Sequence, residues 1–149
     1  MKTKFLYHGS IKKINGKLIP KKADDLENKK ENLHKAVYST SVKDAAIAMA
    51  IISCKGVIGA SLGYKKPYGT IYAGWPKQKF IYLYTLLTDT FVQSKKGLKQ
   101  WHSFISVKPL KIERLKVKDY LHLVRKSTEK EHKTWVKKNH LEKWIKSLK

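Results

Sequence analysis

The chain of 149 residues has one cysteine, two arginines and only 11 acidic residues. A single cysteine, Cys54, excludes an intramolecular disulfide and fits a reducing compartment. No hydrophobic run approaches the length of a bilayer-spanning helix, and the opening "MKTKFLYHGS" contains no apolar stretch long enough for a signal peptide. We therefore expect a cytoplasmic protein that does not enter a membrane.

Several common functional motifs are also missing. The chain contains no Walker motif and no G-x-G-x-x-G dinucleotide fingerprint. His122, His132 and His140 lack a tight ligand spacing, and one cysteine cannot build a common zinc site, so we expect no metal centre. No serine stands in a His–Asp context for hydrolysis, and Cys54 follows an apolar run, which favours a buried residue over a nucleophile.

Positive charge is the most prominent feature of the composition. Lys and Arg total 33, which gives a formal net charge of +22. Such a chain repels itself unless salt or a polyanion screens it, which makes nucleic acid the leading partner class. An acidic partner protein would also neutralise the charge, and a compositional bias towards lysine at solvated positions is the alternative explanation.

The hydrophobic content of 42% is high enough for a folded core despite the charge. We expect one α+β domain over residues 1–149, with a sheet-rich core over 1–126 and a basic C-terminal helix over 127–149. Strands are predicted by β-branched and aromatic runs. These runs are Lys4–Tyr7, Ala36–Thr40, "TIYAGW", "KFIYLYTL", "TDTFVQ", "QWHSFISV" and "LKIERLKV".

The clearest helix is "SVKDAAIAMAIISCKG". Ser41 is its expected N-cap, Asp44 complements the helix dipole, and Gly56 is expected to end it. Because it is apolar nearly all round, it should be buried. The following "GVIGASLGYKKPYG", Gly56–Gly69, is rich in glycine and is expected to be a loop.

Two polar regions complete the outline. "KKADDLENKKENLHK" is expected to form a surface loop or a short exposed helix. In the C-terminal helix, Thr128 and Glu131 form a capping-box pattern, and Trp135 falls outside the apolar stripe. That stripe consists of Leu141, Trp144, Ile145 and Leu148.

Two strand ends carry the functional signal. "FLYHGS" presents His8 directly before a glycine and a hydroxyl, and "AVYST" presents Tyr38 before two hydroxyls, 38 − 8 = 30 residues later. A lone histidine at a strand end is more often structural than functional. A second fragment of the same form favours a shared ligand pocket.

The order "YHGS", "VYST" and the Ala-rich "DAAIAMA" resembles the ADP-ribosyltransferase fold, and more narrowly the small bacterial rifamycin ADP-ribosyltransferases. In that family a "YHGT"-like strand end supplies a histidine and a glycine to NAD, and a "[IV]Y[FL][ST]"-like strand supplies a tyrosine. The segment "SFISVKPLKI", Ser103–Ile112, is similar to a later family segment of the form S-aromatic-x4-P-L-[KR]-I.

The resemblance implies a split antiparallel β-sheet core with one buried helix after the second core strand. It also implies NAD as a substrate, held by His8, Gly9, Ser10, Tyr38 and Ser39. The residue chemistry is compatible with these roles. A histidine bonds ribose hydroxyls through either ring nitrogen, a glycine permits close backbone approach, and a tyrosine ring stacks on nicotinamide while hydroxyls bond its amide.

The third family position, a glutamate just before an aromatic residue on a late strand, corresponds to Gln100 in "KQWHSF". The resemblance therefore makes His8, Tyr38 and Gln100 the candidate catalytic set. A glutamine bonds a ribose hydroxyl but offers no negative charge to the sugar cation that forms as nicotinamide departs. Asp89 in "LTDTF" and Gln93 are the alternatives for this position.

These patterns leave several functions open. The leading hypothesis is an NAD-dependent ADP-ribosyltransferase that modifies nucleic acid, and a small molecule or protein acceptor is an alternative. RNA 2′-phosphotransferase, which shares the fold, relies on more arginines than Arg114 and Arg125. The non-enzymatic alternative is a basic domain that only binds nucleic acid. Trp75 in "GWPKQKF" lies beside lysines in a turn, which suits base stacking or a simple hairpin anchor.

Overall fold

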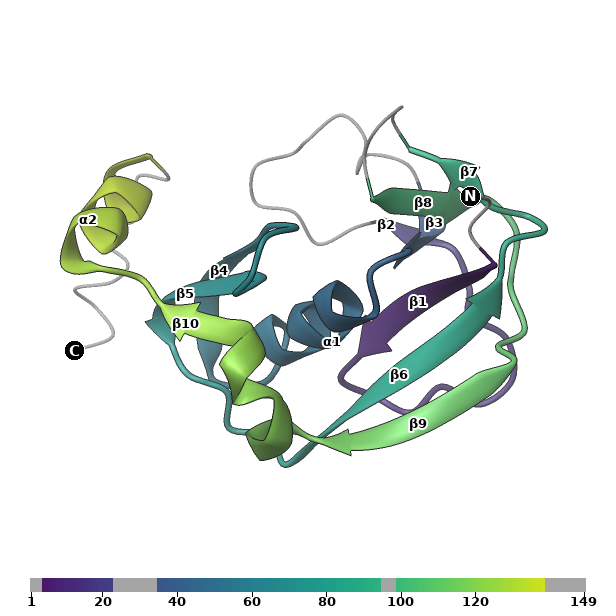
Figure 1. The fold of residues 1–149 in the computed structure, drawn as a ribbon, viewed down its shortest axis with the longest axis horizontal. Helices are drawn as coiled ribbons and strands as arrows, with labels where there is room; N and C mark the ends of the chain where they lie inside the picture. The colour runs from purple at the N-terminus through teal and green to yellow at the C-terminus, as the bar shows by residue number, and fades with distance from the viewer. Residues whose placement is uncertain (1–3, 23–34, 95–98, 139–149) are drawn as a thin grey trace.

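The computed structural model of the chain describes residues 4–22, 35–94 and 99–138. They form an α+β fold whose two sheets are mainly antiparallel, as the sequence indicated. Figure 1 shows the helix α1, Lys43–Ile52, in the centre with one sheet on each side. No helix within the described ranges is long and apolar enough to cross a bilayer.

The larger sheet has the strand order β7-β8-β3-β1-β6-β9, and β2 pairs with β3. Its strands are β1 Phe5–Ser10, β2 Lys21–Lys22, β3 Lys35–Thr40, β6 Phe80–Leu87, β7 Val92–Gln93, β8 Gln100–Ser103 and β9 Lys111–Lys116. The smaller sheet has the order β10-β5-β4, formed by β4 Val57–Leu62, β5 Gly69–Gly74 and β10 Val124–Lys126. The 3₁₀ helix η2, Val117–Leu123, and the helix α2, Glu129–Lys138, complete the described chain.

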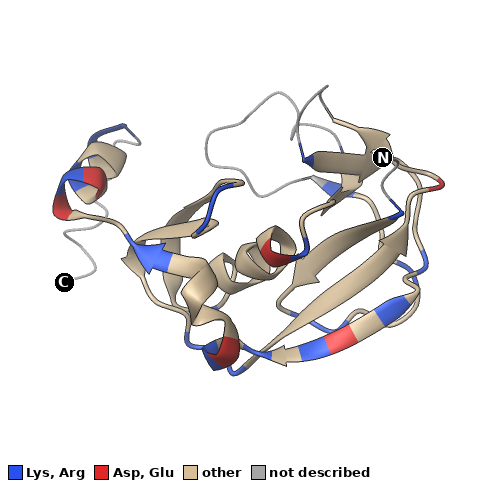
Figure 2. Ribbon diagram, viewed as in Figure 1, with Lys and Arg blue, Asp and Glu red and all other residues tan. Residues whose placement is uncertain are grey.

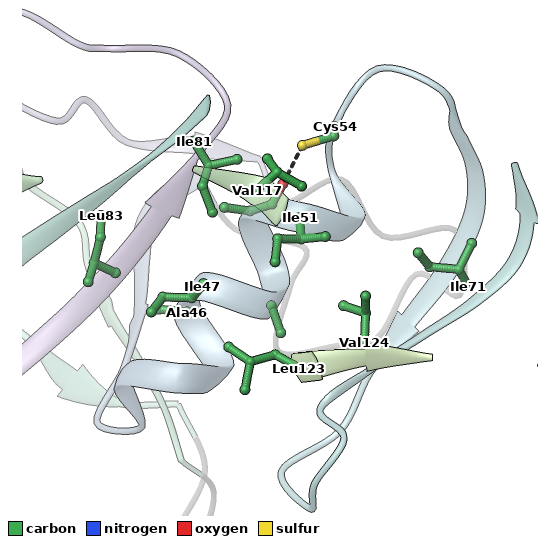
Figure 3. Close-up of a cluster of buried hydrophobic side chains, with 12 residues drawn as sticks. Ala46, Ile47, Ile51, Cys54, Ile71, Ile81, Leu83, Val117, Leu123 and Val124 are labelled. Carbon is green, nitrogen blue, oxygen red and sulfur yellow. Dashed lines mark hydrogen bonds between the residues drawn. The ribbon is translucent and has the colours of Figure 1, made fainter. Parts of the chain in front are cut away.

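The main core surrounds α1. Ala46, Ile47 and Ile51 of the helix are buried against side chains from both sheets, such as Leu83 of β6 and Val124 of β10 (Figure 3). Apolar side chains on different sides of α1 thus pack against different sheets, as expected for a helix that lies between two sheets.

A glycine allows α1 to lie directly against β1. A Cβ built on Gly9 would stand 2.1 Å from the backbone oxygen of Ala46 and 2.9 Å from the Cβ of Ala50. Any larger residue at this position would have to move the helix, so Gly9 has a packing role independent of any ligand.

The two faces of the larger sheet carry different side chains, because side chains alternate along each strand. Tyr7 of β1 packs against the main core, and we call this side the α1 face. The opposite face forms a second cluster that includes Leu6, Val37 and Tyr84. The Tyr84 hydroxyl donates to Lys12 O (3.0 Å) and accepts from the Ile14 amide (2.6 Å), which holds the segment after β1 over this second cluster.

The boundaries of α1 differ from the prediction. The N-cap is Val42, not Ser41, and no side chain caps the helix. The helix ends at Ile52 rather than at Gly56, which lies at φ +95° in the turn before β4. Ala46 N bonds Val42 O (3.1 Å). Asp44 does lie in the first turn, where its charge complements the helix dipole.

The prediction of a loop over Gly56–Gly69 is wrong, because its first half forms β4. Gly59 lies on this strand where a Cβ would stand 2.1 Å from a ring carbon of Trp135. The glycine therefore accommodates a tryptophan from α2 rather than breaking the strand. Trp135 is 9% exposed and stacks on Tyr72, with ring centroids 5.4 Å apart, so it is the docking residue of the helix.

The capping box of α2 is confirmed. The Glu131 amide donates to Thr128 Oγ1 (3.1 Å), and the Thr128 amide donates to Glu131 Oε1 (2.9 Å). Arg125 also forms two hydrogen bonds to the Glu131 carboxylate, which lower the pKa of that carboxyl to about 2. The predicted stripe over 141–148 and the polar stretch 23–34 lie outside the described residues.

We expect Gly9→Ala to lower the free energy of unfolding by about 2–3 kcal/mol, because the added methyl group overpacks the contact with α1. Gly63→Ala is the matched control, since nothing lies within 4 Å of its Cβ position. Urea unfolding measures both variants. Equal destabilisation of the two would contradict the packing role of Gly9.

We expect Thr128→Ala to destabilise α2 by about 1 kcal/mol, because the substitution removes the side-chain acceptor of the capping box. Thr128→Ser keeps the hydroxyl and should retain most of the stability. Hydrogen exchange of the Glu131 amide reports the effect locally. Unchanged protection of that amide in the alanine variant would show that the cap is not stabilising.

Candidate functional site

A hydrogen bond connects the two strand ends that the sequence singled out. His8 Nδ1 lies 2.6 Å from the backbone oxygen of Tyr38. A carbonyl oxygen only accepts hydrogen bonds, so Nδ1 carries the proton. In the neutral ring Nε2 is then an acceptor, and no partner for it lies among the described residues. This contact assigns Nε2 as the nitrogen available to a ligand.

The environment of His8 favours the neutral imidazole. Burial lowers the pKa of His8 below its ordinary value, and the positive charge of Lys21 acts in the same direction. The hydrogen bond to Tyr38 raises the pKa of His8, but by less than burial lowers it. The ring lies at a tilt to Tyr84, with centroids 6.0 Å apart, on the opposite face of the sheet from α1.

The three strands that carry His8, Tyr38 and Gln100 are consecutive neighbours in the larger sheet, in the order β1-β3-β8. The ladder between β1 and β3 consists of the single pair Tyr7–Thr40, and no backbone pairing joins the strands at His8 and Tyr38. We call this unpaired stretch the opening. The His8 ring reaches across this opening to the Tyr38 carbonyl. His8 therefore contacts the backbone of Tyr38 rather than its phenol.

The side chains of Tyr38 and Gln100 share the α1 face. Thr40 pairs with Tyr7 and with Gln100, which places all three on that face, and Tyr38 and His102 form the next pair on the same side. We call Tyr38, Thr40, Gln100 and His102 the Tyr38 surface. The structure thus places Tyr38 and Gln100 on one face, whereas His8 lies on the other face and contacts the backbone oxygen of Tyr38.

Two aromatic contacts extend the Tyr38 surface. Tyr64, from the connection between β4 and β5, lies near the Thr40 side chain. Burial raises the pKa of the Tyr64 phenol, and Thr40 opposes this effect. His102 Nδ1 lies 2.8 Å from Ser94 Oγ, and its ring makes an edge contact with Phe104 at 4.8 Å. The surface therefore combines hydroxyl, amide, imidazole and aromatic groups from both sheets.

The predicted hydroxyls occupy different positions. Ser39 is 6% exposed, and its Oγ has no hydrogen-bond partner among the described residues. Its pairing with Trp101 places Ser39 on the same face as His8, opposite the Tyr38 surface. A buried hydroxyl without a partner is costly, so Ser39 Oγ is suited to bond a polar ligand group on that face. Ser10 accepts a hydrogen bond from the Lys12 amide (3.2 Å) in the turn after β1. At Gly9, the backbone that approaches most closely is that of α1.

A carboxylate is lacking where the resemblance expects one. The strands β1, β3 and β8 contain no aspartate or glutamate. Asp89 is exposed in the turn after β6, and Gln93 is exposed on β7 opposite Trp101. Gln100 is the candidate for the third position that shares a face with Tyr38.

The remaining candidates for a nucleophile or a metal ligand, Cys54 and His132, have structural contacts. Cys54 is buried, its Sγ lies 3.5 Å from Ala50 O, and burial raises the pKa of the thiol to about 11, as expected for a core residue. His132 Nδ1 lies 2.6 Å from Tyr72 O, which helps to hold α2 on β5. Within the described ranges, no three histidine, cysteine or acidic side chains form a metal-binding group.

His102 was not identified from the sequence, whereas the aromatic and cationic segment "GYKKPYG", which contains Tyr64, was a candidate to line the pyrophosphate or a substrate. In "QWHS", Trp101 packs into the second cluster, so alternation places Gln100 and His102 together on the other face. That signal was available in the sequence. The position of the β4–β5 connection near Thr40 was not available, because it depends on how the two sheets meet. No protein-family model, curated protein or solved structure matches the chain.

We expect His8 to make the fold acid-sensitive. Its pKa is lowered in the folded state, so below roughly 6.5, its unfolded value, the unfolded chain binds more protons and stability falls as pH decreases. His8→Asn donates an amide N–H to the Tyr38 carbonyl without titrating. Urea unfolding at pH 7.5, 6.5 and 5.5 should therefore show a smaller loss in His8→Asn than in the wild type. Equal losses would contradict this role.

Proposed function

We propose that the protein is an NAD-dependent ADP-ribosyltransferase that modifies nucleic acid. The observation that carries the proposal is the 2.6 Å hydrogen bond from His8 to the Tyr38 carbonyl, which joins the two motifs of the ADP-ribosyltransferase resemblance on adjacent strands. The two sheets with α1 between them, entered directly from β3, support an ADP-ribosyltransferase-like split core.

The groups around the opening between β1 and β3 suit NAD. His8 Nε2 is an acceptor for a ribose hydroxyl, and Ser39 Oγ is a buried hydroxyl whose hydrogen-bonding capacity is unused among the described residues. The Tyr38 ring offers a face for nicotinamide. When bound, NAD supplies an ADP-ribosyl group with nicotinamide as its leaving group.

Gln100 determines how fast such a site can act. Its amide shares the α1 face with Tyr38 and serves as a hydrogen-bond partner for a ribose hydroxyl. An amide provides no negative charge to oppose the positive charge that develops on the sugar, so we expect slow NAD cleavage without an acceptor. Acceptor binding would then be needed for efficient transfer.

The surface charge supports nucleic acid as the acceptor. The formal net charge of +22 attracts polyanions over long distances. Figure 2 shows lysine and arginine distributed over both sheets and α2, with few acidic positions between them. A neutral small-molecule acceptor leaves this charge without a function.

The proposal is tested by incubating the protein with NAD labelled in the adenylate half, with single-stranded DNA, RNA or no acceptor. We expect label transfer to nucleic acid and nicotinamide release, and a loss of about 100-fold or more in His8→Ala and Tyr38→Ala. Tyr38→Phe keeps the stacking face and His122→Ala alters an exposed histidine outside the site, so both should stay active. If the wild type and the variants bind nucleic acid but none of them cleaves NAD, the non-catalytic alternative is indicated.

Gln100→Glu tests the third position separately. If Gln100 lies beside the ribose, a carboxylate there should increase nicotinamide release by about 10-fold or more, because it stabilises the developing positive charge. Gln93→Glu adds the same charge on the exposed β7 and should have little effect. A larger increase from Gln93→Glu than from Gln100→Glu would assign the position to Gln93.

A further inference from the structure

A second site lies at the other end of the larger sheet. A groove of about 470 Å³ runs between the β5–β6 connection and the junction of β9 with η2. Its lining includes two aromatic residues and three lysines, which we call the basic groove: Trp75, Phe80, Lys79, Lys116 and Lys118. The lining contains no acidic residue, and this volume falls within the range of about 300–1,000 Å³ typical of ligand sites.

The basic groove is separate from the Tyr38 surface. Gln100, Thr40, Tyr7, Thr85 and Lys111 lie in one row across the sheet, and Phe80 and Lys116 form the row at the far end of β6 and β9. Five residues along a strand separate the two rows, or about 17 Å. His8, which belongs to the proposed NAD site, pairs with Tyr84, four residues or about 14 Å from Phe80 along β6, so the groove is set apart from this residue as well.

The first wall of the groove is held rigidly by hydrogen bonds. The Trp75 amide donates to Gly56 O (3.0 Å), and the Lys77 amide donates to Lys55 O (2.8 Å). Gln78 accepts from the Lys55 amide (2.9 Å) through its side chain. These bonds fix the β5–β6 connection along its length.

The second wall is tied to the first. The Val117 amide donates to Lys79 O (3.0 Å), which joins the end of β9 to the segment before β6. Phe80 and Lys116 are cross-strand partners, so their side chains stand side by side on one face. The groove thus exists without any rearrangement, which reduces the entropy cost of binding.

Both rings of the basic groove already attract cations. The Arg114 guanidinium lies 4.5 Å from the Phe80 ring centroid, and Lys126 Nζ lies 5.2 Å from the Trp75 ring. Cations held on aromatic faces next to further lysines create a positive region bordered by flat apolar surfaces. Asp119 on η2 is exposed and is the acidic residue next to Lys118.

We propose that the basic groove binds single-stranded nucleic acid, with a base stacked on Phe80, the cross-strand partner of Lys116, and the flanking phosphates on Lys79, Lys116 and Lys118. Aromatic stacking platforms beside a cationic track are the features by which proteins hold single strands without sequence preference. An acidic peptide would use the lysines but not the rings. This site does not depend on the proposed ADP-ribosyl transfer, and its binding requires no NAD.

The test measures fluorescence anisotropy of a labelled single-stranded oligonucleotide of about twelve nucleotides, without NAD, at several salt concentrations. In the triple variant in which Lys79, Lys116 and Lys118 are all replaced by glutamine, we expect affinity to fall by about 10-fold or more. The slope of log affinity against log salt should decrease in magnitude by about 2. The control is a second triple variant, in which Lys17, Lys99 and Lys108 are replaced by glutamine. It removes the same charge from exposed positions towards the other end of the sheet. The control should lose less than about threefold.

Phe80→Leu tests the stacking contact. It should weaken binding by about 5- to 100-fold and leave the salt slope unchanged, because it removes a ring and no charge. Circular dichroism checks that each variant is folded. Equal losses in the two lysine variants, or full affinity in folded Phe80→Leu, would overturn the proposal. Competition by polyglutamate as strong as that by an oligonucleotide of equal charge would also overturn it and indicate an acidic protein partner.

Discussion

The close contact between β1 and α1 at Gly9 is the constraint on which the rest of the structure depends. Because no Cβ is present, the Ala46 carbonyl comes directly against β1, and the helix then fills the space between the two sheets. The helix begins at Lys43, three residues after β3 ends at Thr40, so its position also fixes β3. The one ladder pair between β1 and β3, Tyr7–Thr40, lies near this connection. No backbone pairing joins the strands at His8 and Tyr38, and His8 bridges this opening.

The larger sheet therefore has two chemically different ends. At one end, the opening and the Tyr38 surface offer an imidazole nitrogen, a buried hydroxyl, an amide and aromatic rings, but no carboxylate on β1, β3 or β8. At the other end, the basic groove combines rings with lysines. The first set suits the nicotinamide and ribose groups of the proposed NAD ligand, and the second suits a polyanion. This division assigns a role to Lys79, Lys116 and Lys118 among the 33 lysines and arginines of the chain.

Long strands were predictable from the sequence, and contacts between distant segments were not. β6 and β9 show the β-branched, aromatic and alternating patterns of buried sheet strands, and the Thr128–Glu131 cap is a local pattern. The strand β4 was missed because its glycine resembles a loop residue, whereas Gly59 makes room for Trp135 of α2. For the site, the spacing of His8 and Tyr38 indicated a pair. That His8 bonds the Tyr38 carbonyl, and lies on the other face from Gln100, follows only from strand pairing.

The most direct measurement is an NMR titration of the isotopically labelled protein, first with NAD and then with a single-stranded oligonucleotide. The two-site account predicts that NAD shifts the resonances of His8, Ser39 and Tyr38 and leaves those of Lys116 and Lys118 unchanged. The oligonucleotide should then shift the resonances of Phe80, Lys116 and Lys118. If NAD shifts no resonance of β1, β3 or β8, or shifts those of the basic groove instead, the account is contradicted.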